Sequence, residues 1–130
     1  MLDLLETADR AGLVLQPSNS RDPAWICCCC GCCCGVLRTI KTYPKPAELV
    51  AAPFAVTLNA DGCTSCGLCV GRCQIGALAF KGKSVQLNSH RCIGCGLCVS
   101  TCPAGALQLT HKPRSQQPRV PANMATALLR

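Results

Sequence analysis

The stretch CTSCGLCVGRCQIGALAF at residues 63–80 recurs 29 positions later as CIGCGLCVSTCPAGALQL at residues 92–109. When the two copies are superimposed, their four cysteines coincide, and so do the segments GLCV and GAL. Each copy has the spacing C-x2-C-x2-C-x3-C. Self-similarity at a fixed offset indicates two copies of one structural unit lying side by side.

This cysteine spacing is typical of ligands to cubane iron–sulfur clusters. A cubane presents its irons at the corners of a tetrahedron, so thiolates two residues apart let one loop contact three of them. In the bacterial two-cluster arrangement, the fourth thiolate comes from the other copy. Applied to this chain, that arrangement gives two interleaved ligand sets: Cys63, Cys66, Cys69 and Cys102 for cluster 1, and Cys92, Cys95, Cys98 and Cys73 for cluster 2.

Zinc is the alternative metal for such a pattern, because CxxC pairs also bind zinc. Zinc sites usually present two such pairs, whereas each copy here has three cysteines and a fourth three residues on. The spacing therefore favours iron–sulfur. The C-x3-C-x2-C motif of radical enzymes does not occur in the chain.

Residues 54–110 resemble a bacterial-type ferredoxin with two 4Fe–4S clusters. The resemblance implies an α+β fold of two β-hairpins and two short helices with pseudo-two-fold symmetry. In that fold, strand 54–58 pairs with 106–109, and 78–87 form a hairpin that turns at Gly82-Lys83. The resemblance also implies that each fourth cysteine opens a short helix packed over the clusters.

One position departs from the family pattern. The usual proline after the fourth cysteine is present as Pro103, but Gln74 stands there in the first repeat. Glutamine restores a backbone N–H, which we expect to bond a cluster sulfur or to admit water, and either would shift the reduction potential of the nearer cluster. Gly67 and Gly96 are expected to let the backbone lie close to the clusters.

Composition explains why the fold needs metal ligands. The 130 residues include 15 Cys but one Trp, one Tyr and two Phe, so a large apolar core is not expected. The N-terminus MLDLLETADR lacks the basic and apolar regions of a secretory signal, which predicts reduced thiols and a cytoplasmic location. The longest apolar run, 25–37, is shorter than the roughly 20 residues of a membrane span, so no span is expected.

The rest of the chain divides into four segments. Residues 1–22 predict an amphipathic helix ending around Gly12, then the loop QPSNSRDP. Residues 23–43 form a Cys-rich segment and 44–53 a linker, and VLRTIKTYPKPAEL across their junction predicts a strand or turn. The tail, 111–130, has the Pro, Gln and Ser content of a flexible segment, with a turn of helix expected at NMATALLR.

Seven further cysteines occupy residues 27–34, interrupted only by Gly31. An odd number cannot all pair as disulfides, and no single ion can gather all seven, because neighbouring side chains point in different directions on a helix or a strand. Four interpretations stay open. They are a third iron–sulfur cluster, a zinc or polynuclear thiolate site, a thiol relay through Cys27/Cys30 or Cys30/Cys33, and small buried hydrophobic residues.

The run 12–40 resembles a CNCCxCCC segment that precedes the two-cluster domain in larger iron–sulfur proteins of anaerobic bacteria. Cys28 stands where that pattern has Asn, and Leu15 where it commonly has His. The resemblance also implies that the chain is a short version, or a part, of such a protein. It implies a metal-ligand role for Cys27, Cys29, Cys30, Cys32, Cys33 and Cys34.

Charge restricts the expected partners. The formal net charge is +7, and eight thiolates with two doubly positive cores would bring it to about +3. Nothing after Asp61 is acidic, so we expect redox partner proteins with an acidic docking surface. No aromatic residue follows Phe80 to stack on bases, which argues against nucleic-acid binding.

These patterns predict electron transfer through two 4Fe–4S clusters, by a ferredoxin or by the electron-wiring module of a larger redox system. An extra metal or iron–sulfur site is expected in the N-terminal cysteines. The chain contains no nucleotide-binding loop of the GxGxxG or GxxxxGKS kind, so we do not expect it to be an enzyme by itself. The alternative is a metal-handling or cofactor-assembly protein with a ferredoxin module.

Overall fold

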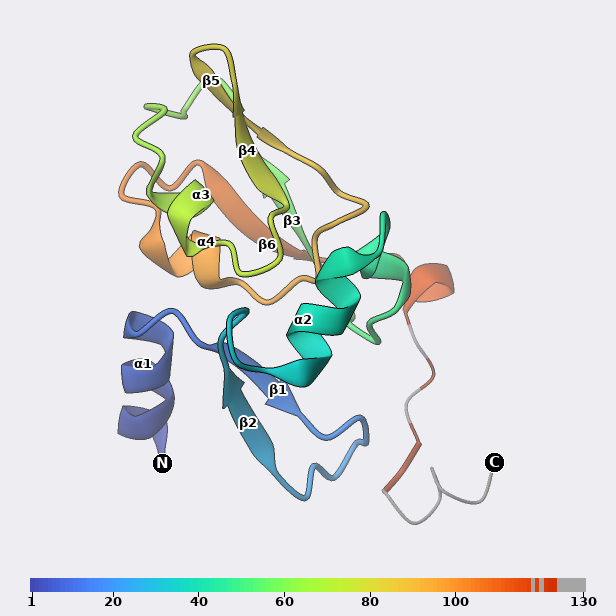
Figure 1. The fold of residues 1–130 in the computed structure, drawn as a ribbon. Coiled ribbons are helices and arrows are strands. Elements are labelled where there is room, and N and C mark those ends of the chain that lie inside the picture. Colours follow the sequence, from blue (N-terminus) through green and yellow to red (C-terminus); the bar gives the residue numbers. More distant parts are fainter. Residues whose placement is uncertain (118, 120, 124–130) are drawn as a thin grey trace.

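The computed structural model describes residues 1–117, 119 and 121–123. Within these residues the protein is a small α+β structure with short helices and three two-stranded antiparallel sheets. Figure 1 shows the hairpin of β4 (Leu78–Lys81) and β5 (Ser84–Leu87) at one end and the pair of β1 (Val14–Pro17) and β2 (Ile26–Cys29) at the other.

The repeat region contains two strand pairs and two short helices. Strand β3 (Phe54–Leu58) pairs with β6 (Leu107–His111). Helix α4 (Leu97–Thr101) lies beside β6, and α3 (Leu68–Arg72) lies beside α4 and β4 (Figure 1). The predicted strand at 54–58 and the predicted hairpin at 78–87 are confirmed. Gly82 adopts φ 63°, and a positive φ at this position suits a two-residue hairpin turn.

Two details of this region differ from the prediction. The partner of β3 begins at Leu107 and continues to His111, instead of covering residues 106–109. The fourth cysteines, Cys73 and Cys102, end the two helices instead of opening them. The helices begin earlier because Gly67 and Gly96, with φ 79° and 81°, turn the chain into a helix just ahead of each third cysteine.

The N-terminal region contains α1 (Leu2–Arg10), the β1–β2 pair and α2 (Gly35–Thr42), followed by a 3-10 turn at Pro46–Glu48. The helix predicted within 1–22 is confirmed as α1, but the predicted loop starts two residues later because Gln16 and Pro17 belong to β1. Gln16 and Pro17 pair with Cys27 and Ile26 of β2, so pairing with a second strand extends β1 into the loop sequence.

The strand or turn predicted for residues 36–49 is wrong, because α2 occupies its first half. Leu37 and Ile40 lie three residues apart and give this helix an apolar face, of which Leu37 is fully buried. The helix ends before Pro44, and Tyr43 is already extended, as the residue before a proline prefers. The prolines thus end a helix here and do not prevent one.

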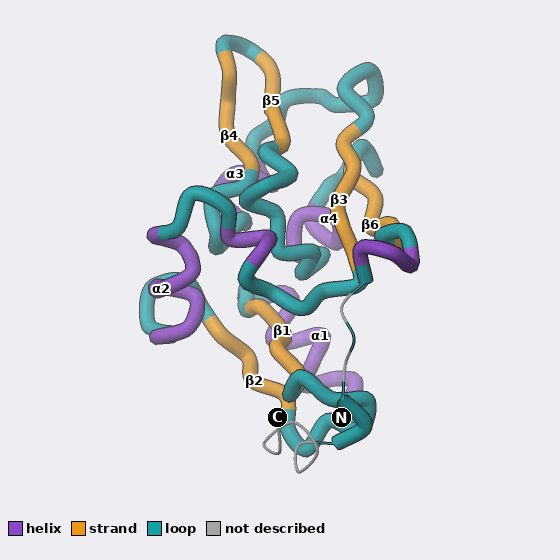
Figure 2. The backbone as a smooth tube through the Cα atoms, turned by 90° about the vertical axis from the view of Figure 1, so that its right-hand side faces the viewer, coloured by secondary structure: helices purple, strands orange, loops and turns teal. Residues whose placement is uncertain are grey.

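The N-terminal region packs on the repeat region through a shared core. Val14 and Leu37 join Ile75, Ile93 and Leu97 in one buried cluster. Figure 2 shows β1, β2 and α1 below α3 and α4, at the opposite end from β4 and β5. A second cluster, around Val56, Leu78 and Leu107, lies within the repeat region.

The C-terminal segment continues past β6 into a 3-10 turn at Arg114–Gln116. Its residues 121 and 122 accept hydrogen bonds from the backbone N–H groups of Arg21 and Asp22. The flexible tail predicted for 111–130 falls partly, and the helical turn predicted at 123–130 almost wholly, outside the described residues. Among the helices of the described chain, none has the length and hydropathy to cross a membrane.

Candidate metal centres

The four cysteines predicted for cluster 1 surround one cavity. Cys63, Cys66 and Cys69 come from the first repeat, and Cys102 comes from the second. Leu58, Val85 and Leu107 complete a largely apolar wall. The cavity has a volume of about 320 Å³, including its open mouth.

The four cysteines predicted for cluster 2 surround a second cavity of the same size. Here Cys92, Cys95 and Cys98 come from the second repeat and Cys73 from the first. Its wall contains Val56, Ile75, Leu87 and Leu97, among other apolar side chains. Four thiols around an apolar hollow fit the thiolate ligation of a 4Fe–4S cluster.

The end of each short helix distributes the thiols between the two cavities. The third cysteine of each repeat lies inside a helix, but at the fourth the chain becomes extended, with ψ 101° at Cys73 and 109° at Cys102. The fourth thiol consequently leaves the face of its own helix and lines the other cavity.

Burial opposes ionisation of the innermost thiols. Cys69 and Cys98 are buried, and burial raises the pKa of Cys69 and, with the charges of Cys95 and Cys92, raises the pKa of Cys98 to about 12. These thiols therefore stay protonated near neutral pH until a metal displaces the proton.

Backbone N–H groups donate hydrogen bonds to the sulfurs of the fourth cysteines. The N–H of Ala77 donates to Cys73 Sγ over 3.2 Å. Burial also disfavours the thiolate of Cys102, but the backbone N–H groups of residues 104–107 outweigh it and lower the pKa of this thiol. The two repeats thus place N–H donors at the corresponding thiol, and hydrogen bonds to cluster sulfurs are one of the factors that set a cluster's reduction potential.

The N-terminal cysteines do not form one group. Cys27 and Cys28 are exposed on β2, whereas Cys29 and Cys34 are half-buried against the core that contains Val14 and Leu37. The remaining three lie in the turn between β2 and α2, with their thiol sulfurs within 4.8 Å of one another: Cys30, Cys32 and Cys33.

Hydrogen bonds within this turn separate the acidities of its thiols. The Cys32 thiol, with the backbone N–H groups of Cys33 and Cys32, lowers the pKa of Cys30 to about 6. Hydrogen bonds to Cys32 and Cys30, together with their negative charge, raise the pKa of Cys33 to about 11. Hydrogen bonds from its neighbours therefore stabilise the thiolate form of Cys30.

Residues 55–103 match the family model of a 4Fe-4S dicluster domain. All eight repeat cysteines fall inside this match, and the N-terminal cysteines fall outside it. The match supports an iron–sulfur domain of the ferredoxin type in this segment and indicates binding of 4Fe–4S clusters. A search of curated proteins finds no match to the chain.

Gln74 joins this dicluster domain to the N-terminal region. Its side-chain Oε1 accepts a 2.8 Å hydrogen bond from the backbone N–H of Gly31, and its Nε2 donates to the carbonyl of Gly12 over 2.8 Å. Gln74 directly follows Cys73, which lines the second cavity. The sequence marked Gln74 as a departure from the family pattern, but its two partners are 43 and 62 residues away along the chain.

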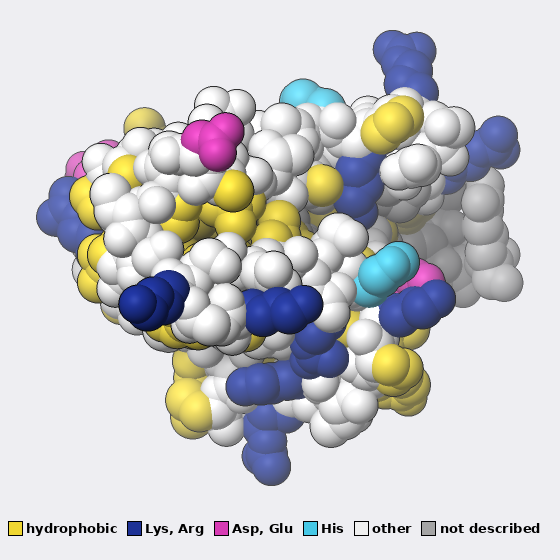
Figure 3. Space-filling model, turned by 90° about the horizontal axis from the view of Figure 1, so that it is seen from above, with side chains coloured by type: hydrophobic (Ala, Val, Ile, Leu, Met, Phe, Trp, Pro, Cys, Tyr) yellow, Lys and Arg dark blue, Asp and Glu magenta, His cyan; other side chains and the backbone are white. Residues whose placement is uncertain are grey.

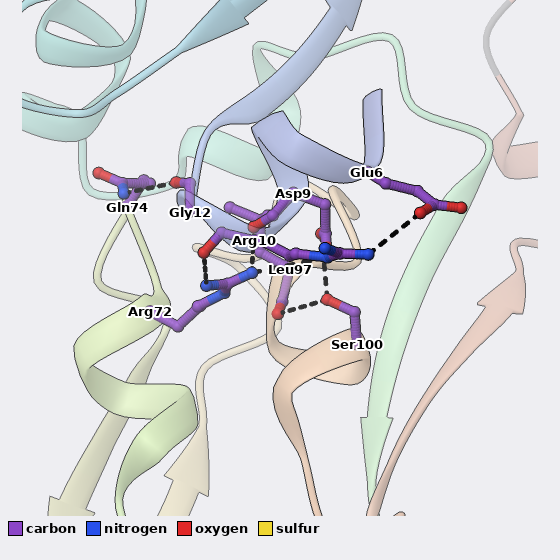
Figure 4. Close-up of polar contacts among 8 residues, drawn as sticks. All are labelled: Glu6, Asp9, Arg10, Gly12, Arg72, Gln74, Leu97 and Ser100. Atoms are coloured by element: carbon purple, nitrogen blue, oxygen red, sulfur yellow. Dashed lines mark hydrogen bonds and ion pairs between the residues drawn. The ribbon is translucent and has the colours of Figure 1, made fainter. Parts of the chain in front are cut away.

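Arg72 and Ser100, which the sequence did not single out, strengthen this junction. Arg72 donates to the carbonyls of Asp9 and Arg10 at the end of α1, where a cation suits the helix dipole (Figure 4). Ser100, on α4, donates to the Asp9 carboxylate over 3.0 Å.

Arg91 joins the C-terminal end of α2 to the same domain. Its guanidinium donates to the carbonyls of Lys41 and Tyr43 on one side and of Ile75 and Gly76 on the other. The sequence could not predict these contacts, because all four acceptors are backbone carbonyls, which every residue has.

Replacing Gln74 with Ala is expected to loosen the turn at Gly31. The variant loses two hydrogen bonds worth about 1 kcal/mol each, so the Gly31 amide should exchange with solvent at least about tenfold faster. Hydrogen exchange measured by NMR or mass spectrometry tests this. Pro103→Ala, at the matching position of the other repeat, is the control. Equal exchange of Gly31 in both variants would contradict the bridging role.

Proposed function

We propose that this protein transfers electrons through two 4Fe–4S clusters held at the two cavities of the dicluster domain. The observation that supports this is the grouping of the eight repeat cysteines, four at each cavity and each set drawn from both repeats. When bound, each cluster accepts and releases one electron. The proposed ligand sets are Cys63, Cys66, Cys69 and Cys102, and Cys73, Cys92, Cys95 and Cys98.

The surrounding residues suit this role. Val56 and Leu107 lie in one buried cluster against which six of the eight cysteines are packed or to which they belong, so the two cavities have a common apolar wall. An apolar wall of this kind limits the access of water to both sites. The N–H donors at Cys73 and Cys102 stabilise thiolates in this apolar setting.

The surface charge supports a partner with an acidic docking surface. Figure 3 shows more Lys and Arg than Asp and Glu side chains on the face seen from above. The formal charge of +7 still leaves about +3 when two oxidised clusters are bound. We propose that the chain is a carrier or wiring module in the cytoplasm, and not an enzyme by itself.

Metal analysis of anaerobically purified protein tests the electron-transfer proposal. We expect about eight irons and eight sulfides per chain, and reduction by about two electrons in a titration followed by electron paramagnetic resonance. About four irons per chain, or iron that accepts no electrons, would refute it.

A second candidate function is metal handling through the N-terminal cysteines. The observation that favours it is the close approach of the three thiols in the turn between β2 and α2, which lie outside the dicluster match.

A further inference from the structure

The fold separates the turn cysteines from the other cysteines of the N-terminal block. On β2, Cys27 and Cys28 point to opposite sides of the strand, because side chains alternate along an extended chain. Cys34 lies 3.9 Å from the Gln16 amide and packs on the core with Cys29. The three remaining thiols therefore form a group of their own in the turn: Cys30, Cys32 and Cys33.

The spacing of these three sulfurs fits one metal ion. Cys32 Sγ lies 2.9 Å from Cys30 Sγ and 3.6 Å from Cys33 Sγ, and all three lie within 4.8 Å of one another. With zinc–sulfur bonds of about 2.3 Å in tetrahedral geometry, two thiolates on one ion lie roughly 3.8 Å apart. The group needs only small side-chain movements to reach this spacing.

A third cubane requires wider spacing, because its thiolates bind different irons at separate corners. The eight repeat cysteines, all within the described chain, follow this rule: no three of their sulfurs lie within 4.8 Å of one another. The turn therefore differs from both predicted cluster sites in the same molecule. Its geometry favours a single ion over a third iron–sulfur cluster.

The turn is also held in place before any metal binds. The backbone N–H of Cys34 donates to the carbonyl of Cys30 over 3.2 Å, which closes the turn. Gly31 sits so close to the dicluster domain that a Cβ there would lie 2.7 Å from the carbonyl oxygen of Gln74. From these contacts and the 3.8 Å spacing of consecutive residues, the Cα atoms of Cys32 and Cys73 lie at most about 14 Å apart.

Exposure leaves room for a fourth ligand. Cys32 and Cys33 are exposed and Cys30 is half-buried, so the outer side of the group faces solvent. Structural zinc sites use four protein ligands, whereas three leave a position for water or an incoming ligand. A site of this kind can exchange its metal.

We propose that Cys30, Cys32 and Cys33 bind one thiophilic divalent ion of the zinc type, with the fourth coordination position open to solvent. Any of the three thiols that is still protonated releases its proton to solvent on binding, and no oxidant or reductant is consumed. The proposal goes beyond electron transfer and assigns the metal-handling candidate a defined site. It narrows the six N-terminal ligands implied by family resemblance to three.

Zinc binding to the intact iron-loaded protein tests the proposal. The protein is incubated anaerobically with zinc, separated from excess metal and analysed for zinc and iron together. We expect one zinc per chain, unchanged iron, and an X-ray absorption spectrum at the zinc edge with three sulfurs at about 2.3 Å and one lighter ligand. No retained zinc, or four sulfur ligands, would overturn it.

Two serine variants locate the site. Cys33→Ser should retain at least about tenfold less zinc at a fixed concentration of competing chelator. Cys28→Ser, also exposed and in the same segment, should retain as much as the unchanged protein. Equal zinc in both variants, or a gain of about four irons that depends on Cys33, would refute the proposal. Iron content reports on the dicluster domain separately, so failure of the zinc site is distinguishable from failure of the electron-transfer proposal.

Discussion

Replacing Cys73 and Cys92 together with Ala is expected to leave about four irons per chain, the same as replacing Cys92 alone. Both thiols line the second cavity, so the second substitution removes a ligand from a cluster that is already lost. Replacing Cys73 and Cys63 together should remove nearly all iron, because these thiols line different cavities. Iron and sulfide analysis of anaerobically purified variants measures the difference.

If the Cys73 and Cys92 pair lost nearly all iron and the Cys73 and Cys63 pair kept about four irons, the arrangement would be sequential. Each repeat would then hold its own cluster with its own four cysteines. The matched pair for the other cavity is Cys102 with Cys63, which should behave as Cys73 with Cys92 does. If each single variant already lost all its iron, the two sites would depend on one another for folding. That result would contradict the assignment of the cysteines to two clusters that can be lost independently.

Replacing Gly94 with Ala is expected to destabilise the dicluster domain by at least about 3 kcal/mol, which is large for a single methyl group. Gly94 adopts φ 70°, a conformation that costs a non-glycine residue roughly 1–2 kcal/mol. Its added Cβ would also lie 2.3 Å from the carbonyl oxygen of Phe54, at the start of β3. Backbone atoms cannot yield as a flexible side chain does, so the strand must move.

The matched control lies in the other repeat. Ser65 occupies the corresponding position between the first two cysteines, has φ 55° and already carries a side chain, so Ser65→Ala should have an effect under about 1 kcal/mol. The measurement is the guanidinium concentration at which half of the cluster absorbance is lost, since a cofactor-bound protein does not unfold in two states. Similar midpoints for both variants would disprove the clash at Gly94.

The features that the sequence predicted well are local and repeated. The C-x2-C-x2-C-x3-C spacing fixes how one loop can present three thiols, and it occurs twice. The hairpin turn at Gly82 depends on residues next to each other in the chain, and it formed as predicted. The family match then placed an iron–sulfur domain on the same segment.

Features decided by distant contacts were missed or misplaced. Helix α2 has a buried face only because Leu37 meets Ile75 and Ile93, which lie in the repeats. Its two apolar positions at 37 and 40 were the one local signal, and the nearby prolines obscured it. The start of the strand Val14–Pro17 likewise depends on the same shared core.

The amino-acid sequence by itself determined the two cysteine repeats and the chemistry of their ligands, because ligand spacing within a loop is a local, covalent property. Only the tertiary structure divided the seven N-terminal cysteines, setting three thiols in one turn and two against the core. The tertiary structure also showed that Gln74, which the sequence marked only as the absence of a proline, connects that turn to the dicluster domain by hydrogen bonds. The reason is that a side chain's partners across 43 residues depend on how separate elements pack, and no local pattern encodes that packing.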